Sequence, residues 1–161
     1  MKTLYLIRHA KSSWDFDLED HERPLNERGQ NDANLIGAEL KVKIENIDKI
    51  ICSSAVRALS TAKIILKHLD IDDSEMEIMD ALYDFEGNQV VEVIKNCDDR
   101  INQLMLFGHN HAFTSLSNLL GTARIDNLPT AGVVKIEFDI QHWRQISEGK
   151  TKEVLYPKLF K

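Results

Sequence analysis

The sequence has few of the residues that mark fibrous, disulfide-rich or membrane-embedded proteins. Two cysteines, three prolines and seven glycines in 161 residues exclude a disulfide scaffold, a collagen-like repeat and a Pro/Gly-rich disordered chain. The apolar runs are far shorter than the roughly 18 residues that indicate a membrane span. The N-terminus also lacks the features of a secretory signal peptide. We therefore expect a cytoplasmic protein with no membrane partner.

Negatively charged residues outnumber positively charged ones. Lys and Arg total 20 against 26 Asp and Glu, which gives a formal net charge of −6. No overall basic field exists to hold nucleic acid, so a bound anion must be held by a local group of basic side chains. The composition is 43% hydrophobic and 29% charged, as in ordinary globular proteins. This length predicts a single domain over residues 1–161.

Strand-like and helix-like patterns alternate along the chain. Apolar or alternating runs predict strands over residues 4–7, 47–52, 76–79, 104–107 and 133–138. Apolar positions three and four residues apart predict helices over about 27–44, 55–69, 89–97 and 113–120. Asn26 is the expected N-cap of the first helix, and the strand over 133–138 is expected to be exposed on one face. The order predicts an α/β three-layer sandwich, with a mostly parallel central sheet flanked by helices.

Basic and histidine side chains follow three of the predicted strands. Arg8 and His9 end the first strand, Arg57 follows the second, and His109 follows the strand over 104–107. Ligands of parallel sheets bind at the carboxyl ends of strands. Two of these segments also precede predicted helices, whose N-terminal amides favour a bound anion. We therefore predict a phosphate pocket at this edge of the sheet.

Other chemistries fit the sequence less well. His109 and His111 could contribute to a metal site, but no carboxylate or Cys cluster accompanies them, so we expect no metal. The acidic loop over residues 15–22 has Asp20 where a calcium loop needs its turn glycine, which favours a solvated loop. The histidines without a strand-end position are interpreted as structural, and these are His21, His68 and His142.

Cys52 and Arg57 invite comparison with cysteine phosphatases. In those enzymes five residues separate the nucleophile from the phosphate-binding arginine and wrap the phosphate, whereas four residues intervene here. The shorter loop closes differently, so Cys52 is interpreted as a buried strand terminus.

Five motifs together resemble one known family. They are Leu6–Trp14, Pro24–Gly29, Ser53–Ala58 with Thr61–Ala62, Gly108–Asn110 and Pro129–Val133. Their residues and order resemble the histidine phosphatase superfamily, and within it the small SixA-type phosphohistidine phosphatase branch. The resemblance spans nearly the whole chain and implies a phosphoglycerate-mutase-like fold.

The resemblance also implies roles for individual residues. By motif position, His9 corresponds to the nucleophile, and Arg8, Arg57 and His109 to the groups that hold the phosphoryl group. The chemistry agrees, because an attacking imidazole must be neutral and nearby guanidinium groups disfavour its protonation. Two arginines and a second imidazole can also stabilise a transferring phosphoryl group without a metal or another cofactor. A phosphohistidine intermediate on His9 would form and then be hydrolysed by water.

Two positions depart from the wider family or match it loosely. Many members have Gly and Asn where this chain has Ala10 and Asp15, and an ionised Asp15 could not donate a hydrogen bond to phosphate. Asp84 lies in a segment that loosely resembles the one in which larger members carry an acidic proton donor. The alternative for Asp84 is a surface turn residue near Gly87. A P–N substrate would need such an acid less than an ester would.

These observations predict a metal-independent phosphatase that acts on phosphohistidine in a protein, with phosphate or vanadate as further ligands of the site. The alternatives are a phosphatase for a small phosphate ester or phosphoanhydride, and a phosphohistidine-binding adaptor without turnover. Short connections after the key strands predict an open site. The acidic loop over residues 15–22 is expected to favour a basic protein surface over free metabolites.

Overall fold

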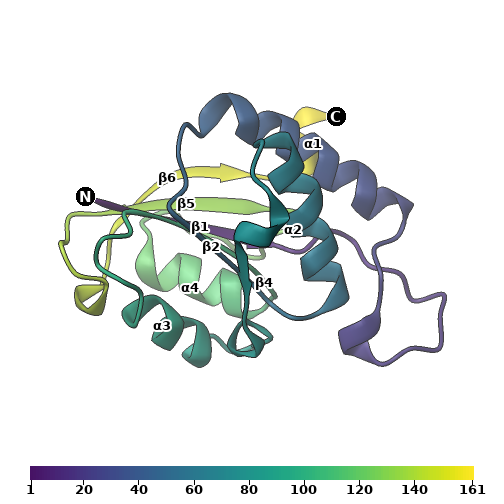
Figure 1. The fold of residues 1–161 in the computed structure, drawn as a ribbon, viewed down its shortest axis with the longest axis horizontal. Coiled ribbons are helices and arrows are strands. Elements are labelled where there is room, and N and C mark those ends of the chain that lie inside the picture. Colours follow the sequence, from purple (N-terminus) through teal and green to yellow (C-terminus); the bar gives the residue numbers. More distant parts are fainter.

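The computed structural model describes all of residues 1–161, with one sheet between two layers of helices (Figure 1). The strands are β1 (Lys2–Arg8), β2 (Lys49–Cys52), β3 (Met76–Ile78), β4 (Gln103–Gly108), β5 (Val133–Phe138) and β6 (Lys150–Leu155). The α-helices are α1 (Glu27–Lys43), α2 (Val56–His68), α3 (Asn88–Lys95) and α4 (Ala112–Leu120). Five 3₁₀ helices join them: η1 (Asp20–Glu22), η2 (Asp73–Glu75), η3 (Asp80–Leu82), η4 (Trp143–Gln145) and η5 (Pro157–Phe160). The predicted α/β sandwich is confirmed.

The sheet has the strand order β3-β2-β4-β1-β5-β6. The first four of these run parallel, whereas β5 is antiparallel to β1 and β6 is antiparallel to β5. In the register of β1 with β4, Arg8 lies opposite Gly108, and the His9 N–H continues the ladder by donating to the Gly108 carbonyl at 3.0 Å. The residues that follow β1 and β4 therefore lie side by side at the carboxyl edge of the sheet.

The two faces of the sheet bury separate apolar layers. Along β1, Tyr5 and Ile7 pack with the buried side chains of α1 and α2, whereas Leu4 and Leu6 pack with those of α3 and α4. Successive side chains of a strand point to opposite faces, so one apolar run supplies both layers. Figure 1 shows α1 and α2 on one side of the sheet and α3 and α4 on the other. None of the helices combines the length and the apolar character that a membrane crossing requires.

Most predicted elements are confirmed, with ends displaced by a few residues. The edge strand β6 was not predicted, because its Lys-Thr-Lys-Glu start carries almost no apolar signal. The expected exposed face of β5 is also wrong in part, since Lys135 and Glu137 are half-buried. Lys135 extends over the ring of Tyr5, with its Nζ 5.8 Å from the ring centroid.

The start of α1 is tied to the segment that follows His9. Asn26 is the N-cap, as predicted, and its Oδ1 accepts from the Gly29 N–H at 2.8 Å. The Asn26 N–H in turn donates to the Lys11 carbonyl at 3.1 Å. A Cβ at Gly29 would overlap that same Lys11 carbonyl oxygen, so only glycine permits this close approach.

We expect Gly29→Ala to lower the free energy of unfolding by about 1–3 kcal/mol, although Ala is the better helix former. Urea unfolding measures the change. Asn31→Ala, at an exposed position of the same helix, is the matched control. A Gly29→Ala protein as stable as this control would contradict the close approach.

Candidate active site

The carboxyl edge of the sheet brings three of the predicted site residues together. His9 follows β1, His109 follows β4, and Arg57 lies in the first turn of α2. The centroids of the two imidazole rings are 5.2 Å apart, and the Nε of Arg57 lies 3.3 Å from the Nε2 of His9. All three are buried, with 8% of His9, 2% of Arg57 and 1% of His109 exposed. Arg8 is half-buried beside them, and its Nη1 donates to the Leu128 carbonyl at 2.7 Å.

The hydrogen bonds of His9 define its tautomer. Its Nδ1 lies 2.7 Å from the Ala10 carbonyl oxygen, which can only accept, so Nδ1 carries the proton. The lone pair of the ring is therefore on Nε2, where it accepts from the Nε of Arg57. A neutral imidazole held in this way presents a nucleophilic nitrogen next to a guanidinium group.

Burial and positive charge keep both imidazoles neutral. Burial lowers the pKa of His9 to about 3, helped by the charges of Arg57 and Arg8, although the bond to Ala10 opposes the shift. Burial lowers the pKa of His109 to about 2, helped by His9 and Arg57. The arginine charges act in the direction expected from the sequence. Desolvation is the larger cause of the lowered pKa values, and it arises only when the folded chain buries the two rings.

Two polar atoms of the site are buried without a partner. The Nε2 of His109 lies 2.8 Å from the Ser53 hydroxyl oxygen, but its Nδ1 has no partner, and neither has the Nε of Arg8. The other buried atoms of this kind are the carboxylate oxygens of Asp32, which lie near the charges of Arg28 and Lys161. Buried polar groups are normally paired, so the two site atoms indicate a place for a polar ligand.

Asp20 balances the charge of Arg57. Arg57 donates from Nη1 to the Asp20 carbonyl at 2.6 Å and from Nη2 to the Asp20 carboxylate at 2.9 Å. Tyr83 donates its hydroxyl to the same carboxylate at 2.6 Å, and Arg23 donates to it at 3.2 and 3.3 Å. Burial alone would raise the pKa of Asp20, but the bonds from Tyr83 and Arg57 outweigh it and hold the pKa at about 2. Asp20 thus supplies the counter-charge that buried guanidinium groups require, while its side chain stays 44% exposed, as the solvated-loop interpretation expects.

Aromatic rings border His109. Tyr83 and Phe85 meet its ring edge-on, with centroids 5.3 and 5.2 Å away, and they meet each other at 5.1 Å. His21 lies against Tyr83 at 4.9 Å, and its Nε2 lies 2.8 Å from the Ser54 hydroxyl. Sequence reasoning missed Tyr83 and Arg23, and it set His21 aside. One argument could have pointed to such residues: several buried cations need acidic and hydroxyl groups as partners.

Asp84 is engaged by the backbone. Its Oδ2 accepts from the N–H groups of Gly87, Gln89 and Val90, and its Oδ1 accepts from that of Glu86. These bonds cap the start of α3 and favour the alternative of a turn residue, although Asp84 is buried rather than on the surface. Its role as a proton donor stays a prediction.

The side chains of the remaining predicted positions make no hydrogen bond with the histidine pair. Asp15 is exposed, and its backbone N–H donates to the Ser13 hydroxyl. His111 is exposed at the start of α4. Cys52 is completely buried, and this burial raises the pKa of its thiol, as expected for a strand terminus. No group of three or more His, Cys, Asp or Glu side chains is arranged to hold a metal ion, and metal-independent chemistry stays a prediction.

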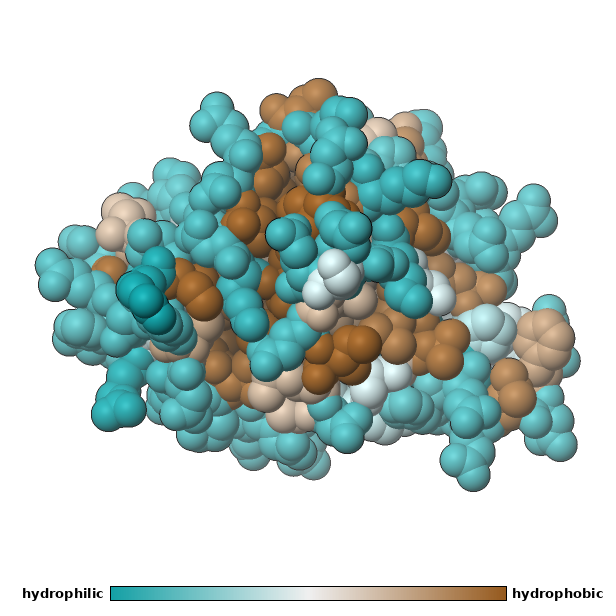
Figure 2. Space-filling model, viewed as in Figure 1, coloured by the Kyte–Doolittle hydropathy of each residue, from teal (hydrophilic) through white to brown (hydrophobic).

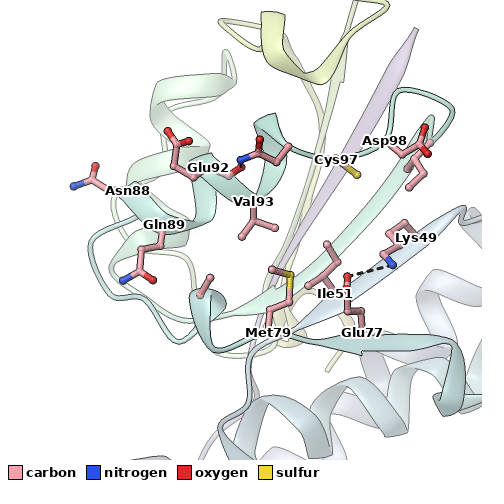
Figure 3. Close-up of a pocket in the computed structure, with 13 residues that line it drawn as sticks. Lys49, Ile51, Glu77, Met79, Asn88, Gln89, Glu92, Val93, Cys97 and Asp98 are labelled. Carbon is pink, nitrogen blue, oxygen red and sulfur yellow. Dashed lines mark hydrogen bonds and ion pairs between the residues drawn. The ribbon is translucent and has the colours of Figure 1, made fainter.

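A cavity of about 640 Å³ lies elsewhere, between β2, β3 and α3. Figure 3 shows its lining, with Ile51, Met79 and Val93 directed into the space. Its Lys49 is paired with Glu77 at 3.2 Å, so it offers no free cation to an anion. The strand-end residues, rather than this cavity, therefore form the candidate site for phosphoryl chemistry.

Comparison with known families shows which family the chain belongs to. A model of the histidine phosphatase superfamily (branch 1) matches residues 4–104. This span contains Arg8 at the end of β1, His9 after it and Arg57 in α2, and it ends just before His109. The chain belongs to the histidine phosphatase superfamily. Membership of this family supports phosphatase activity.

Two similar proteins carry names that describe them as uncharacterized. An uncharacterized protein of Mycobacterium tuberculosis is 30% identical over 153 residues, which cover 89% of this chain and 93% of that protein. An uncharacterized chloroplastic protein of Arabidopsis thaliana is 27% identical over 154 residues, covering 89% of this chain and 70% of that protein.

Solved structures of histidine phosphatases share the fold. The putative phosphohistidine phosphatase SixA from Agrobacterium tumefaciens superposes with a TM-score of 0.80 at 24% identity, covering 97% of this chain and 98% of that one. The protein histidine phosphatase SixA in complex with tungstate gives 0.83 at 18% identity and covers 99% of both chains. The predicted phosphoglycerate-mutase-like fold is confirmed.

We expect the imidazoles of this histidine phosphatase to remain neutral well below their ordinary pKa. The NMR shifts of the His9 and His109 ring protons should be those of neutral imidazole down to about pH 5, because burial disfavours the charged form. Unfolded histidines bind protons near the ordinary pKa of 6.5, so the free energy of unfolding should fall as the pH drops from about 6.5 towards 3. Spectra of His9→Ala assign the signals of the two rings. A titration midpoint near pH 6.5 for either ring would contradict the prediction.

Proposed function

We propose that this histidine phosphatase removes the phosphoryl group from phosphohistidine in a protein, through a covalent phosphohistidine intermediate on His9. The observation that carries the proposal is the neutral His9, with its lone pair on Nε2, beside two buried and unpartnered nitrogens, the Nε of Arg8 and the Nδ1 of His109. Phosphoryl oxygens are acceptors that satisfy such groups. The names of the similar SixA structures and the tungstate in one of them, an oxyanion like phosphate, support the same substrate class.

The first step transfers the phosphoryl group to His9. The Nε2 lone pair forms a bond to phosphorus, and the P–N bond to the substrate imidazole breaks, with its electron pair leaving on the substrate nitrogen, which takes up a proton from water. Arg57 and Arg8 hold the equatorial oxygens through guanidinium N–H groups that are not used within the protein. As the His9 ring gains positive charge, its Nδ1–H bond to Ala10 strengthens and stabilises it.

The second step returns His9 to its starting state. Water attacks the phosphorus of the phosphorylated Nε2, inorganic phosphate leaves, and Nε2 recovers its lone pair and its contact with Arg57. In the neutral His109 ring, the Ser53 hydroxyl can donate to Nε2, so Nδ1 is free to carry the proton and donate to a phosphoryl oxygen.

The limited provision for a general acid favours a P–N substrate over an ester. Both oxygens of Asp84 already accept backbone N–H groups at the start of α3, so this carboxyl group is engaged as a helix cap. An imidazole leaves more readily than an alkoxide and needs less help from an acid. A small phosphate ester or phosphoanhydride as substrate, and an adaptor that binds phosphohistidine without turnover, are the competing functions.

We expect His9→Ala to abolish turnover of a phosphohistidine protein while the fold is retained, because the nucleophile is lost. Rapid quenching of the wild-type reaction, run with a chelator present, should trap an acid-labile, alkali-stable phosphate on His9. His142→Ala, at an exposed position, is the matched control and should keep full activity. Label on Cys52 or on a serine would contradict the proposed intermediate.

We expect Arg57→Ala and Asp20→Asn to change oxyanion binding in opposite directions. Arg57→Ala should raise the inhibition constant of tungstate or vanadate at least about tenfold, because a buried charged donor is lost. Asp20→Asn should lower this inhibition constant several-fold, because it removes the negative charge of a carboxylate that binds Arg57 and repels the oxyanion. The control for a general effect of charge is Asp17→Asn, which neutralises an exposed carboxylate of the same loop. It should change the inhibition constant less than twofold. Weaker binding by Asp20→Asn would show that Asp20 mainly orients Arg57.

A further inference from the structure

Large apolar side chains are exposed in the loops that border the active site. Trp14, Phe16 and Leu18 expose 73%, 59% and 43% of their surface, and Phe85, which contacts His109, exposes 43%. Every residue from 14 to 20 is exposed. Residues 14–18, called here the docking segment, lie between β1 and η1 in the loop that projects at the right of Figure 1. Figure 2 shows hydrophobic atoms at the end of that projection, surrounded by hydrophilic ones.

The docking segment is joined rigidly to the catalytic groups. The guanidinium of Arg23 lies 3.5 Å from the centroid of the Trp14 ring. Arg23 is buried, donates to the Ser12 hydroxyl at 2.7 Å, and shares the Asp20 carboxylate with Arg57. Trp14 is therefore held in place before a partner arrives, and a preordered aromatic side chain loses little entropy on binding.

The charges around these apolar groups select the partner. Asp15, Asp17 and Glu19 alternate with Trp14, Phe16 and Leu18, and all of them are exposed. A surface of this kind attracts apolar side chains accompanied by Lys or Arg. It repels an anionic lipid surface, and in a second copy of this chain it would meet its own negative charges.

We propose that the docking segment, together with Phe85, binds the phosphorylated protein through a surface of apolar and basic side chains around its phosphohistidine. The proposal rests on the proposed function and extends it, because it assigns substrate recognition to residues outside the catalytic group. The acidic loop repels a phosphoryl group that approaches the site. When the phosphoryl group is carried on such a surface, the basic side chains around it compensate this repulsion. A small free phosphate has no such compensation.

The test compares two substrates across matched variants. The protein substrate is a helical domain phosphorylated on histidine with phosphoramidate, made in one version with Lys and Arg around the histidine and in another with Glu there. The small substrate is phosphoimidazole. The variants are Phe16→Ser/Leu18→Ser and Asp17→Lys. The control is Val42→Ser/Leu119→Ser, which removes two still more exposed apolar side chains from α1 and α4.

For the basic domain, we expect each docking-segment variant to lower kcat/KM at least about tenfold, mainly through KM, because exposed aromatic anchors and opposite charges are lost. For phosphoimidazole, kcat/KM should change less than about twofold in Phe16→Ser/Leu18→Ser, and it should not fall in Asp17→Lys, because the lysine removes repulsion of a free phosphate. The control variant should match the wild type on both substrates, and the wild type should prefer the basic domain to the acidic one. Equal losses on both substrates, or no loss on the basic domain, would overturn the proposal.

Two further measurements separate this proposal from the proposed function. Failure of the wild type to hydrolyse phosphoimidazole and both domains would refute phosphohistidine turnover. Binding of the unphosphorylated basic domain to His9→Ala, followed by NMR titration, tests the docking segment without turnover, and loss of this binding in Phe16→Ser/Leu18→Ser is expected. Sedimentation of the wild type tests self-association, and a dimer that the same double variant dissociates would identify a second copy as the occupant and overturn the proposal.

Discussion

The buried guanidinium of Arg57 is the constraint on which the rest of the site depends. Arg57 is almost fully buried, so its charge requires an internal partner, and the Asp20 carboxylate and carbonyl supply it. The same guanidinium donates to the Nε2 of His9 and helps to keep that ring neutral. One buried cation thus binds the acidic loop and helps to keep His9 neutral, the form that the proposed nucleophile requires.

The loop between β1 and α1 serves the site on two sides. Inward, Asp20 supplies the carboxylate that the buried guanidinium groups of Arg57 and Arg23 share. Outward, the docking segment exposes aromatic and acidic side chains to solvent. Arg23 donates to Asp20 and packs against the ring of Trp14, so it connects the inward part of the loop to the outward part. The proposed docking would use this arrangement to combine catalysis with recognition of a protein surface in a small phosphatase.

Much of the fold could be predicted because its signals are local. The apolar runs of β1 and β4, the spacing of apolar residues in α1 and α2, and the Asn26 cap all operate within a few residues. The strand β6 could not be predicted, since an edge strand buries little surface and its polar sequence is stabilised by pairing with β5. The second side of β5 was also misjudged, because Tyr5, on a neighbouring strand, covers Lys135.

By itself the sequence determined which chemical groups stand at the carboxyl edge of the sheet. His9, Arg57 and His109 each directly follow a strand or begin the next helix, and parallel strands end at a common edge. Only the tertiary structure decided which nitrogen of His9 is free, how far burial lowers its pKa, and that Asp20 rather than solvent neutralises Arg57. Desolvation exists only once the chain is packed, and Asp20 and Arg57 lie 37 residues apart, so no local pattern encodes their contact.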